Sequence, residues 1–207
     1  MEIPASVEKM GEYAVSNCPG LTELIFKGEN LKEIGAYLLS GNSGLKSLEL
    51  PDSITTIGYR AFNSCSSLES VNYPKNWKEC PGYSSFPTVY GSVFEGCTKL
   101  KEIEIPEGTK VIAAHGLKKT EAITRINLPE SVTEIGDYAF AECTGLKRLY
   151  AGKNVGTIGT NSFQGCASLT LYGEGGSYVQ TYATEHEIPF VGGEYAEGMS
   201  VLSGKVT

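Results

Sequence analysis

The six cysteines are the residues of this 207-residue chain with the widest chemistry open to them. A zinc site or a redox pair needs two thiols in close Cys-x-x-Cys spacing, and no two cysteines of this sequence have it. Five of them share one position, three residues before a leucine: Cys18, Cys65, Cys97, Cys143 and Cys166. This regular position favours buried free thiols that line an interior.

Disulfides remain an alternative for the same thiols. Strands that stack about 4.8 Å apart lie within the Cα separation that a disulfide tolerates, so Cys65 could pair with Cys97, or Cys143 with Cys166. Cys80 lies apart from the regular series, in a segment where an exposed thiol is also possible.

The other reactive side chains form no recognisable constellation. His115 and His186 have no nucleophile motif nearby, so a Ser-His-Asp or Cys-His arrangement has no support, and we expect His115 on a solvated turn. The 25 glycines fall at regular corners and not in a phosphate-binding loop. We therefore predict a protein that is not an enzyme, with no catalytic residues, no cofactor and no metal site.

The cysteines belong to a longer repeat of 23 residues. An Ile-Gly pair marks the repeat. A large apolar residue lies five residues after the isoleucine, and a leucine or isoleucine lies six residues after that apolar residue. The last position occurs seven times: Leu21, Leu45, Leu68, Leu100, Ile123, Leu146 and Leu169. Units of this size bury their apolar faces only when stacked copies share one core.

Each unit contains a predicted strand. Leu48 and Leu50 alternate with polar residues, and Pro51 then ends the strand because proline has no backbone donor. A second short extended run ends at the Ile-Gly pair, where we expect the glycine to adopt a positive φ. A short helical or 3₁₀ turn follows. These features predict an α/β repeat solenoid over residues 1–171, with about seven repeats and a parallel strand face opposite the turns.

Repeat four is about nine residues longer than the others, because Leu68 and Leu100 lie 32 residues apart. We place the insertion within residues 75–90, which include Trp77, Tyr83 and Phe86. Loops on a rigid frame often bind partners. These aromatic side chains either fold back to close their own loop, which we favour, or form an exposed recognition loop.

The pattern changes after repeat seven. Residues 172–191 are predicted to cap the solenoid with a short helix, which Ser177 begins, and a final strand. Residues 192–207 are interpreted as a linker toward a missing domain.

The repeat resembles the BspA-type leucine-rich repeat of bacterial cell-surface proteins over roughly residues 3–191. Three units carry its Ile-Gly, Phe and Cys positions most closely: Ile57-Gly58 with Phe62 and Cys65, Ile135-Gly136 with Phe140 and Cys143, and Ile158-Gly159 with Phe163 and Cys166. The resemblance implies an extracellular or cell-surface protein, whose signal peptide would lie outside this chain. It also implies attachment to surface or matrix proteins of a host or neighbouring cell.

Charge narrows the range of partners. The net charge of −7 and the lack of a basic stripe argue against nucleic acid, and no apolar run approaches the ~20 residues of a membrane helix. On the strand face, outward side chains should align in rows. Our candidate partner-binding residues are Asn72, Glu102, Glu104, Arg125, Arg148 and Tyr150, with Trp77, Tyr83 and Phe86 of the insertion. The alternative for the charged rows is simple lateral pairing of Glu102 with Arg125.

We therefore predict a monomeric, non-enzymatic module that binds proteins or mediates adhesion through the strand face and the repeat-four loop. Two alternatives remain at this stage. The repeats could be a structural spacer that holds another domain, or a carbohydrate-binding module in which Trp77 and nearby tyrosines stack against sugars.

Overall fold

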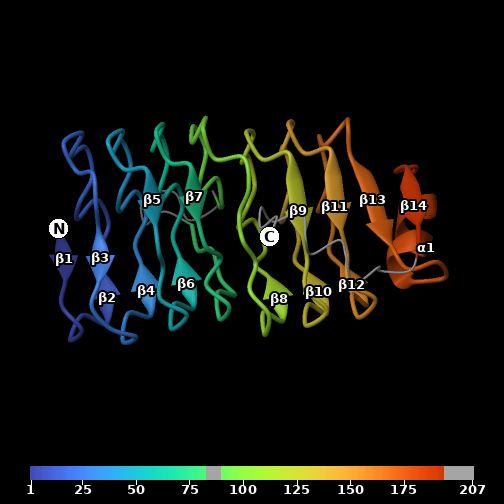
Figure 1. Cartoon of the computed structure of the whole chain (residues 1–207), viewed down its shortest axis with the longest axis horizontal. Coiled ribbons are helices and arrows are strands. Elements are labelled where there is room, and N and C mark those ends of the chain that lie inside the picture. The colour runs from blue at the N-terminus through green and yellow to red at the C-terminus, as the bar shows by residue number, and fades with distance from the viewer. Residues whose placement is uncertain (83–89, 194–207) are drawn as a thin grey trace, which may run out of the picture.

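The computed structural model describes residues 1–82 and 90–193, and the statements below concern these residues. The chain winds into an elongated solenoid whose repeats succeed one another along the long axis of the molecule (Figure 1). The leucine-bearing segments run side by side, which confirms the predicted leucine-rich repeat solenoid.

Two rows of short parallel strands follow the solenoid axis, one for each extended run of the repeat (Figure 1). The first row, called the strand face below, contains β1 (Glu2–Ile3), β3 (Ile25–Phe26), β5 (Ser47–Leu48), β7 (Ser70–Val71), β9 (Arg125–Asn127), β11 (Arg148–Tyr150), β13 (Thr170–Gly173) and β14 (Phe190–Gly192). The second row contains β2 (Lys9–Met10), β4 (Glu33–Ile34), β6 (Thr56–Ile57), β8 (Val111–Ile112), β10 (Glu134–Ile135) and β12 (Thr157–Ile158).

The core lies between the rows and the turns, and each repeat contributes the same positions to it. Leu45, Leu68, Leu100 and Leu146 are completely buried. Aromatic residues of neighbouring repeats also touch, with ring centroids 5.3 Å apart for Phe62 and Phe94. No repeat could bury these side chains alone, so stability comes from stacking.

The glycines of the Ile-Gly pairs do not adopt the positive φ that the sequence suggested. They allow close packing: a Cβ on Gly58 would lie 2.5 Å from the backbone nitrogen of Ala36 in the preceding repeat. Left-handed backbone occurs instead at two later positions. The first position, two residues after the glycine position, has a positive φ at Tyr13, Tyr37, Arg60, Ser92, His115, Tyr138 and Asn161. The second position, four residues further along, has a positive φ at Asn17, Gly41, Ser64, Gly96, Lys119, Glu142 and Gly165.

These left-handed residues explain why the predicted helical segments are separate turns. Ala61, Asn63 and Cys65 each donate a backbone hydrogen bond to the carbonyl three residues earlier, as in a 3₁₀ helix. A left-handed residue every fourth position prevents these turns from joining into a helix.

The C-terminal end of the solenoid is covered by α1 (Tyr178–Glu185) and β14. The hydroxyl of Ser177 accepts a hydrogen bond from the backbone of Gln180, and the helix buries Val179, Tyr182 and Ala183. The predicted linker begins at Gly192, which is the last residue of β14, and residues 194–207 lie outside the described part. In the part of the chain that is described, no helix has the length and apolar character needed to cross a membrane.

Candidate interaction surface

The strand face brings the predicted partner-binding residues into two rows. Arg125 is paired in register with Arg148, and Asn127 with Tyr150. In the other half of the molecule Ser47 is paired with Ser70, and an isolated bridge aligns Asn72 with Glu104. Because parallel strands place equivalent side chains side by side, Glu49, Asn72 and Glu104 form one row, and Asn127 and Tyr150 continue it.

Several of these side chains are already engaged with neighbours. Arg125 forms an ion pair with Glu102, with 3.1 Å between Nη2 and Oε1, so the lateral pairing expected from the sequence is present. The ring of Tyr150 stacks on that of Tyr172, with centroids 4.6 Å apart.

Asn72 has a structural role that the sequence did not reveal. Its side-chain oxygen accepts a hydrogen bond of 2.7 Å from the backbone nitrogen of Leu50, and its side-chain nitrogen donates one of 2.8 Å to the Leu50 carbonyl. The amide is therefore bound to the backbone of the preceding repeat. Asn72 contributes to the floor of the surface and does not project from it.

The strand pairing is interrupted between the coil that contains Glu79 and residues 101–105 and the next coil, which contains β8 and β9, and we call this junction the seam. Among the described residues, β5 and β7 form one sheet and β9, β11, β13 and β14 another, with no strand pairing between residues 101–105 and β9. The second row is interrupted in the same place, between the Thr56–Glu79 bridge and β8.

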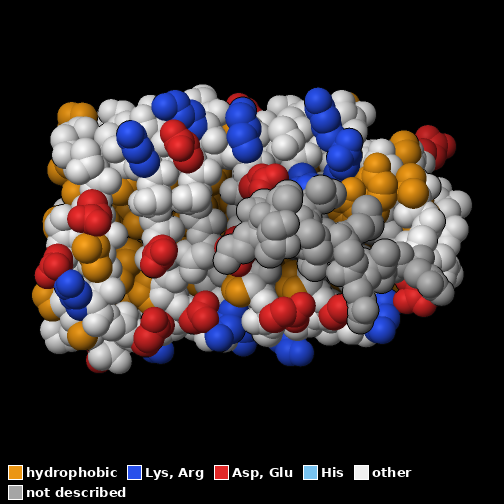
Figure 2. Space-filling model, in the orientation of Figure 1, with side chains coloured by type: hydrophobic (Ala, Val, Ile, Leu, Met, Phe, Trp, Pro, Cys, Tyr) orange, Lys and Arg blue, Asp and Glu red, His pale blue; other side chains and the backbone are white. Residues whose placement is uncertain are grey.

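A groove of about 1060 Å³ lies over the seam on the strand face. It is bordered by residues of β5, β7 and β9 and by residues 99–105. Figure 2 shows that, on the face in view, many Lys and Arg side chains lie along one long edge, whereas acidic side chains lie mainly over the middle and the opposite edge. The volume exceeds the usual range of small-molecule pockets, which suits a segment of a macromolecule better.

Trp77 is not available to a partner, which corrects the sequence-based prediction. It is only 1% exposed, and its indole nitrogen donates a hydrogen bond of 2.8 Å to the Glu79 carbonyl. Trp77 follows Pro74 by three residues, as Ile54 follows Pro51, and it occupies the same core position. Counting from the proline would have identified it as a core residue.

The insertion of repeat four is therefore shorter than the range 75–90. The backbone nitrogen of Ile57 donates to the Glu79 carbonyl, and that of Arg60 donates to the Gly91 carbonyl, so the regular repeat continues to Cys80 and resumes at Gly91. The extra residues lie between these two points. Tyr83 and Phe86 lie outside the described residues, and their predicted role stays a prediction.

The regular cysteines are free, and four are buried as expected. Each of these four thiols donates a hydrogen bond to a carbonyl of the preceding repeat, such as Cys143 to Leu117 at 3.0 Å and Cys166 to Phe140 at 3.1 Å. Cys18, in the first repeat, is exposed. Cys80 is buried, against the alternative of an exposed thiol, and burial raises its pKa to about 12. With its pKa raised in this way, the Cys80 thiol stays protonated and unreactive at neutral pH.

His115 also differs from the solvated turn residue predicted. Its ring stacks between Tyr90 and Tyr138, with centroids 5.2 and 5.0 Å away, and its Nδ1 is buried without a hydrogen-bond partner in the described part. Burial and the nearby Lys118 lower the pKa of His115, while Asp137 partly opposes them. The repeat could have predicted this stacking, because His115 and Tyr138 occupy equivalent positions in neighbouring repeats.

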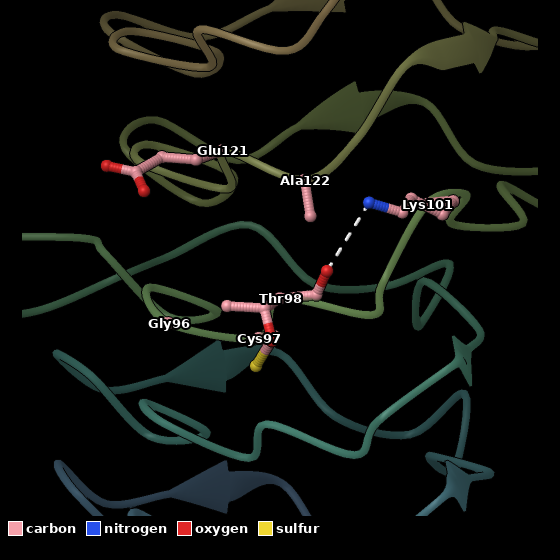
Figure 3. Close-up of a pocket in the computed structure, with 6 residues that line it drawn as sticks. All are labelled: Gly96, Cys97, Thr98, Lys101, Glu121 and Ala122. Carbon is pink, nitrogen blue, oxygen red and sulfur yellow. Dashed lines mark hydrogen bonds between the residues drawn. The ribbon is translucent and has the colours of Figure 1, made fainter.

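A second, smaller cleft of about 230 Å³ lies between the corners of repeats four and five (Figure 3). Lys101 donates a hydrogen bond of 3.4 Å to the Thr98 carbonyl across it, and the Glu121 carboxylate points away from both residues (Figure 3). These side chains provide no nucleophile with an adjacent base. Among the described residues, no group of three His, Cys, Asp or Glu could hold a metal ion.

Comparison with protein families now identifies the repeat. The BspA type leucine rich repeat region matches the chain in six copies, over residues 1–89 and 83–177. The chain belongs to the BspA-type leucine-rich repeat family. No curated protein matches this leucine-rich repeat protein.

Solved structures with the same fold come from several bacteria. A leucine-rich repeat protein from Bacteroides ovatus is 24% identical, with a TM-score of 0.59, and the match covers 93% of this chain but 53% of that one. The T. pallidum leucine rich repeat protein is 22% identical, with a TM-score of 0.63 and coverage of 89% and 81%. The pneumococcal vaccine antigen PcpA is 16% identical, with a TM-score of 0.51 and coverage of 93% and 67%. The chain thus spans about half the length of the Bacteroides ovatus protein.

Proposed function

We propose that this chain is a non-enzymatic, extracellular or cell-surface module that binds another protein through its strand face. The groove over the seam carries this proposal, because it is a large concave surface on a rigid frame and is bordered by charged side chains. The partner would be a surface or matrix protein of a host or neighbouring cell.

Membership of the BspA-type family supports a binding role at the cell surface. One protein of similar fold is a vaccine antigen, which fits exposure at a bacterial surface. The groove also has the size and mixed charge of a protein-binding surface, in which complementary charges provide specificity more than affinity.

A carbohydrate-binding role is not supported. A stacking platform needs a ring face that a sugar can reach, and Trp77 is buried against Tyr73, with ring centroids 4.8 Å apart. A structural spacer remains the competing function, because a solenoid can hold a domain away from a surface without binding anything through its strand face.

The test is capture of surface proteins from a host-cell extract with the immobilised protein and two charge-swap variants. The first variant, Glu104→Lys with Arg125→Glu, changes the strand face. The second, Glu134→Lys with Lys110→Glu, changes exposed residues in and beside the second row and leaves the net charge equal.

A strand-face interaction predicts that the first variant loses a captured protein that the second variant retains. Equal capture by both variants, or capture of nothing by the unmodified protein, would leave the spacer as the better function. A third variant with a shortened insertion tests Tyr83 and Phe86, because unchanged capture would exclude the loop from the interface.

A further inference from the structure

The strand-face groove contains two carboxylates without a partner. Arg125 forms an ion pair with Glu102, and the Nζ of Lys99 lies 3.9 Å from the Oε1 of Glu69. The Nζ of Lys101 donates a hydrogen bond to the Thr98 carbonyl. Each of the three cationic side chains that border the groove therefore already contacts an oxygen atom of the protein. Glu49 and Glu104 border the same groove, and within the described residues neither forms an ion pair or a side-chain hydrogen bond.

The register fixes the separation of the backbone positions that carry these two carboxylates. Leu48 is paired with Val71, and Asn72 with Glu104, so Glu49 and Glu104 stand in one row with the Asn72 strand between them. Two strand spacings correspond to about 9.6 Å. Asn72 leaves the space between them open, because its amide is bound to the backbone of Leu50.

A complementary segment must present two cationic side chains on one face at this separation. Along a β-strand, side chains on one face recur at about 6.6 or 13 Å, which fits poorly. A polyproline II helix has three residues per turn and a rise of about 3.1 Å, so every third side chain returns to the same face after about 9.3 Å. This value agrees with the spacing of the row to within about 0.3 Å.

We propose that the groove binds a proline-rich segment of a partner protein in polyproline II conformation, with Lys or Arg at every third position. One basic side chain pairs with Glu49 and the next with Glu104, and the backbone of the segment runs along the row, above Asn72. This inference rests on the proposed function and defines the chemistry of the partner.

The test uses two labelled peptides of equal length and composition. The first repeats Lys-Pro-Pro, and the second has the same lysines placed in adjacent pairs. Fluorescence anisotropy at low salt measures the binding of each peptide to the unmodified protein, to Glu49→Gln with Glu104→Gln, and to Glu8→Gln with Glu107→Gln. The last variant removes the same charge at exposed positions outside the groove.

The first peptide should bind more tightly than the second, and the Glu49 and Glu104 variant should lose about fivefold in affinity for each carboxylate removed. The Glu8 and Glu107 variant should bind like the unmodified protein, and added salt should weaken all binding. Circular dichroism of each variant verifies that it is folded.

Equal binding of the two peptides, or equal effects of the two variants, would overturn the inference. So would tighter binding of an alanine-rich helical peptide with lysines seven residues apart, because that spacing is about 10.5 Å on one face. The proposed function fails separately. If the strand-face charge swap abolishes protein capture but the proline-rich peptide does not bind, the module binds proteins of another chemistry.

Discussion

The regular C-terminal repeats and the seam are held together in different ways. Between β8, β10 and β12, and between β9, β11, β13 and β14, main-chain pairing continues from repeat to repeat. Turn residues also bond to the next repeat there, as when the Leu117 nitrogen donates to the Ala139 carbonyl at 3.0 Å. At the seam neither row has paired strands in the described part of the chain, although the Thr124 nitrogen still donates a main-chain hydrogen bond of 3.1 Å to the Lys101 carbonyl.

Side chains replace the missing pairing at the seam. The Tyr73 hydroxyl accepts a hydrogen bond of 2.7 Å from the backbone nitrogen of Ala113, across the junction. Trp77 fills the core against repeat five, where a Cβ on Gly116 would come within 3.1 Å of the indole. Tyr90 with His115 and Glu102 with Arg125 also connect the two sides. A solenoid can thus accommodate an insertion if large side chains restore contact between the repeats.

Replacing Trp77 should have the largest effect. Trp77→Ala should lower the free energy of unfolding by about 3–5 kcal/mol, because it leaves a cavity between two repeats. Val132→Ala changes the equivalent core position of a regular repeat and removes fewer atoms, so its loss should be smaller. Urea denaturation followed by circular dichroism measures both. If both variants lost the same free energy of unfolding, Trp77 would be no more important at the seam than Val132 is in a regular repeat.

Tyr73→Phe should have the next largest effect. The variant keeps the ring but leaves the buried nitrogen of Ala113 without its acceptor, so we expect a loss of about 1–3 kcal/mol. Tyr150→Phe is the matched control on the partly exposed strand face and should change stability by less than about 0.5 kcal/mol. If both variants were equally stable, another group would have to satisfy the Ala113 nitrogen.

The stacked core could be predicted from the sequence because each core position repeats at constant spacing. The repeated spacing predicted that Phe62, Phe140 and Leu146 lie in the core, and all three are buried. The left-handed turn positions could not be predicted in this way. They hold residues as different as Tyr37, Arg60 and Asn161, because contacts between repeats select the backbone conformation there and the side chain does not.

The interaction surface was predictable only in part. The alignment of Arg125 with Arg148 followed from the repeat, and the structure confirms it. The groove depends on two features without a sequence signature, namely the orientation of the Asn72 amide and the interruption of pairing at the seam. Trp77 was misplaced for a different reason. We placed the insertion of about nine residues within residues 75–90 and did not continue the register of the repeat from Pro74 to Trp77.

His115 should make the stability of the seam depend on pH. Its folded pKa is lowered, so the unfolded chain binds more protons, and stability should fall as the pH decreases through and below about 6.5. His115→Tyr should remove this component, since Tyr138 already holds the equivalent left-handed position. Melting temperatures of both proteins at pH 5 and pH 7.5 provide the measurement. An identical pH dependence in the variant, or greater stability of the unmodified protein at low pH, would contradict the prediction.

The Glu102–Arg125 ion pair should contribute least among the seam contacts. The Glu102 side chain is 62% exposed and that of Arg125 is 19% exposed, so water and salt screen the attraction although part of the arginine is packed. A double-mutant cycle with Glu102→Gln and Arg125→Gln should give a coupling energy of about 0–1 kcal/mol that decreases with added salt. A larger coupling would mean that the strand face also helps to join the two halves of the solenoid. A small one leaves these charges free to select a partner, since their loss would then change binding without unfolding the seam.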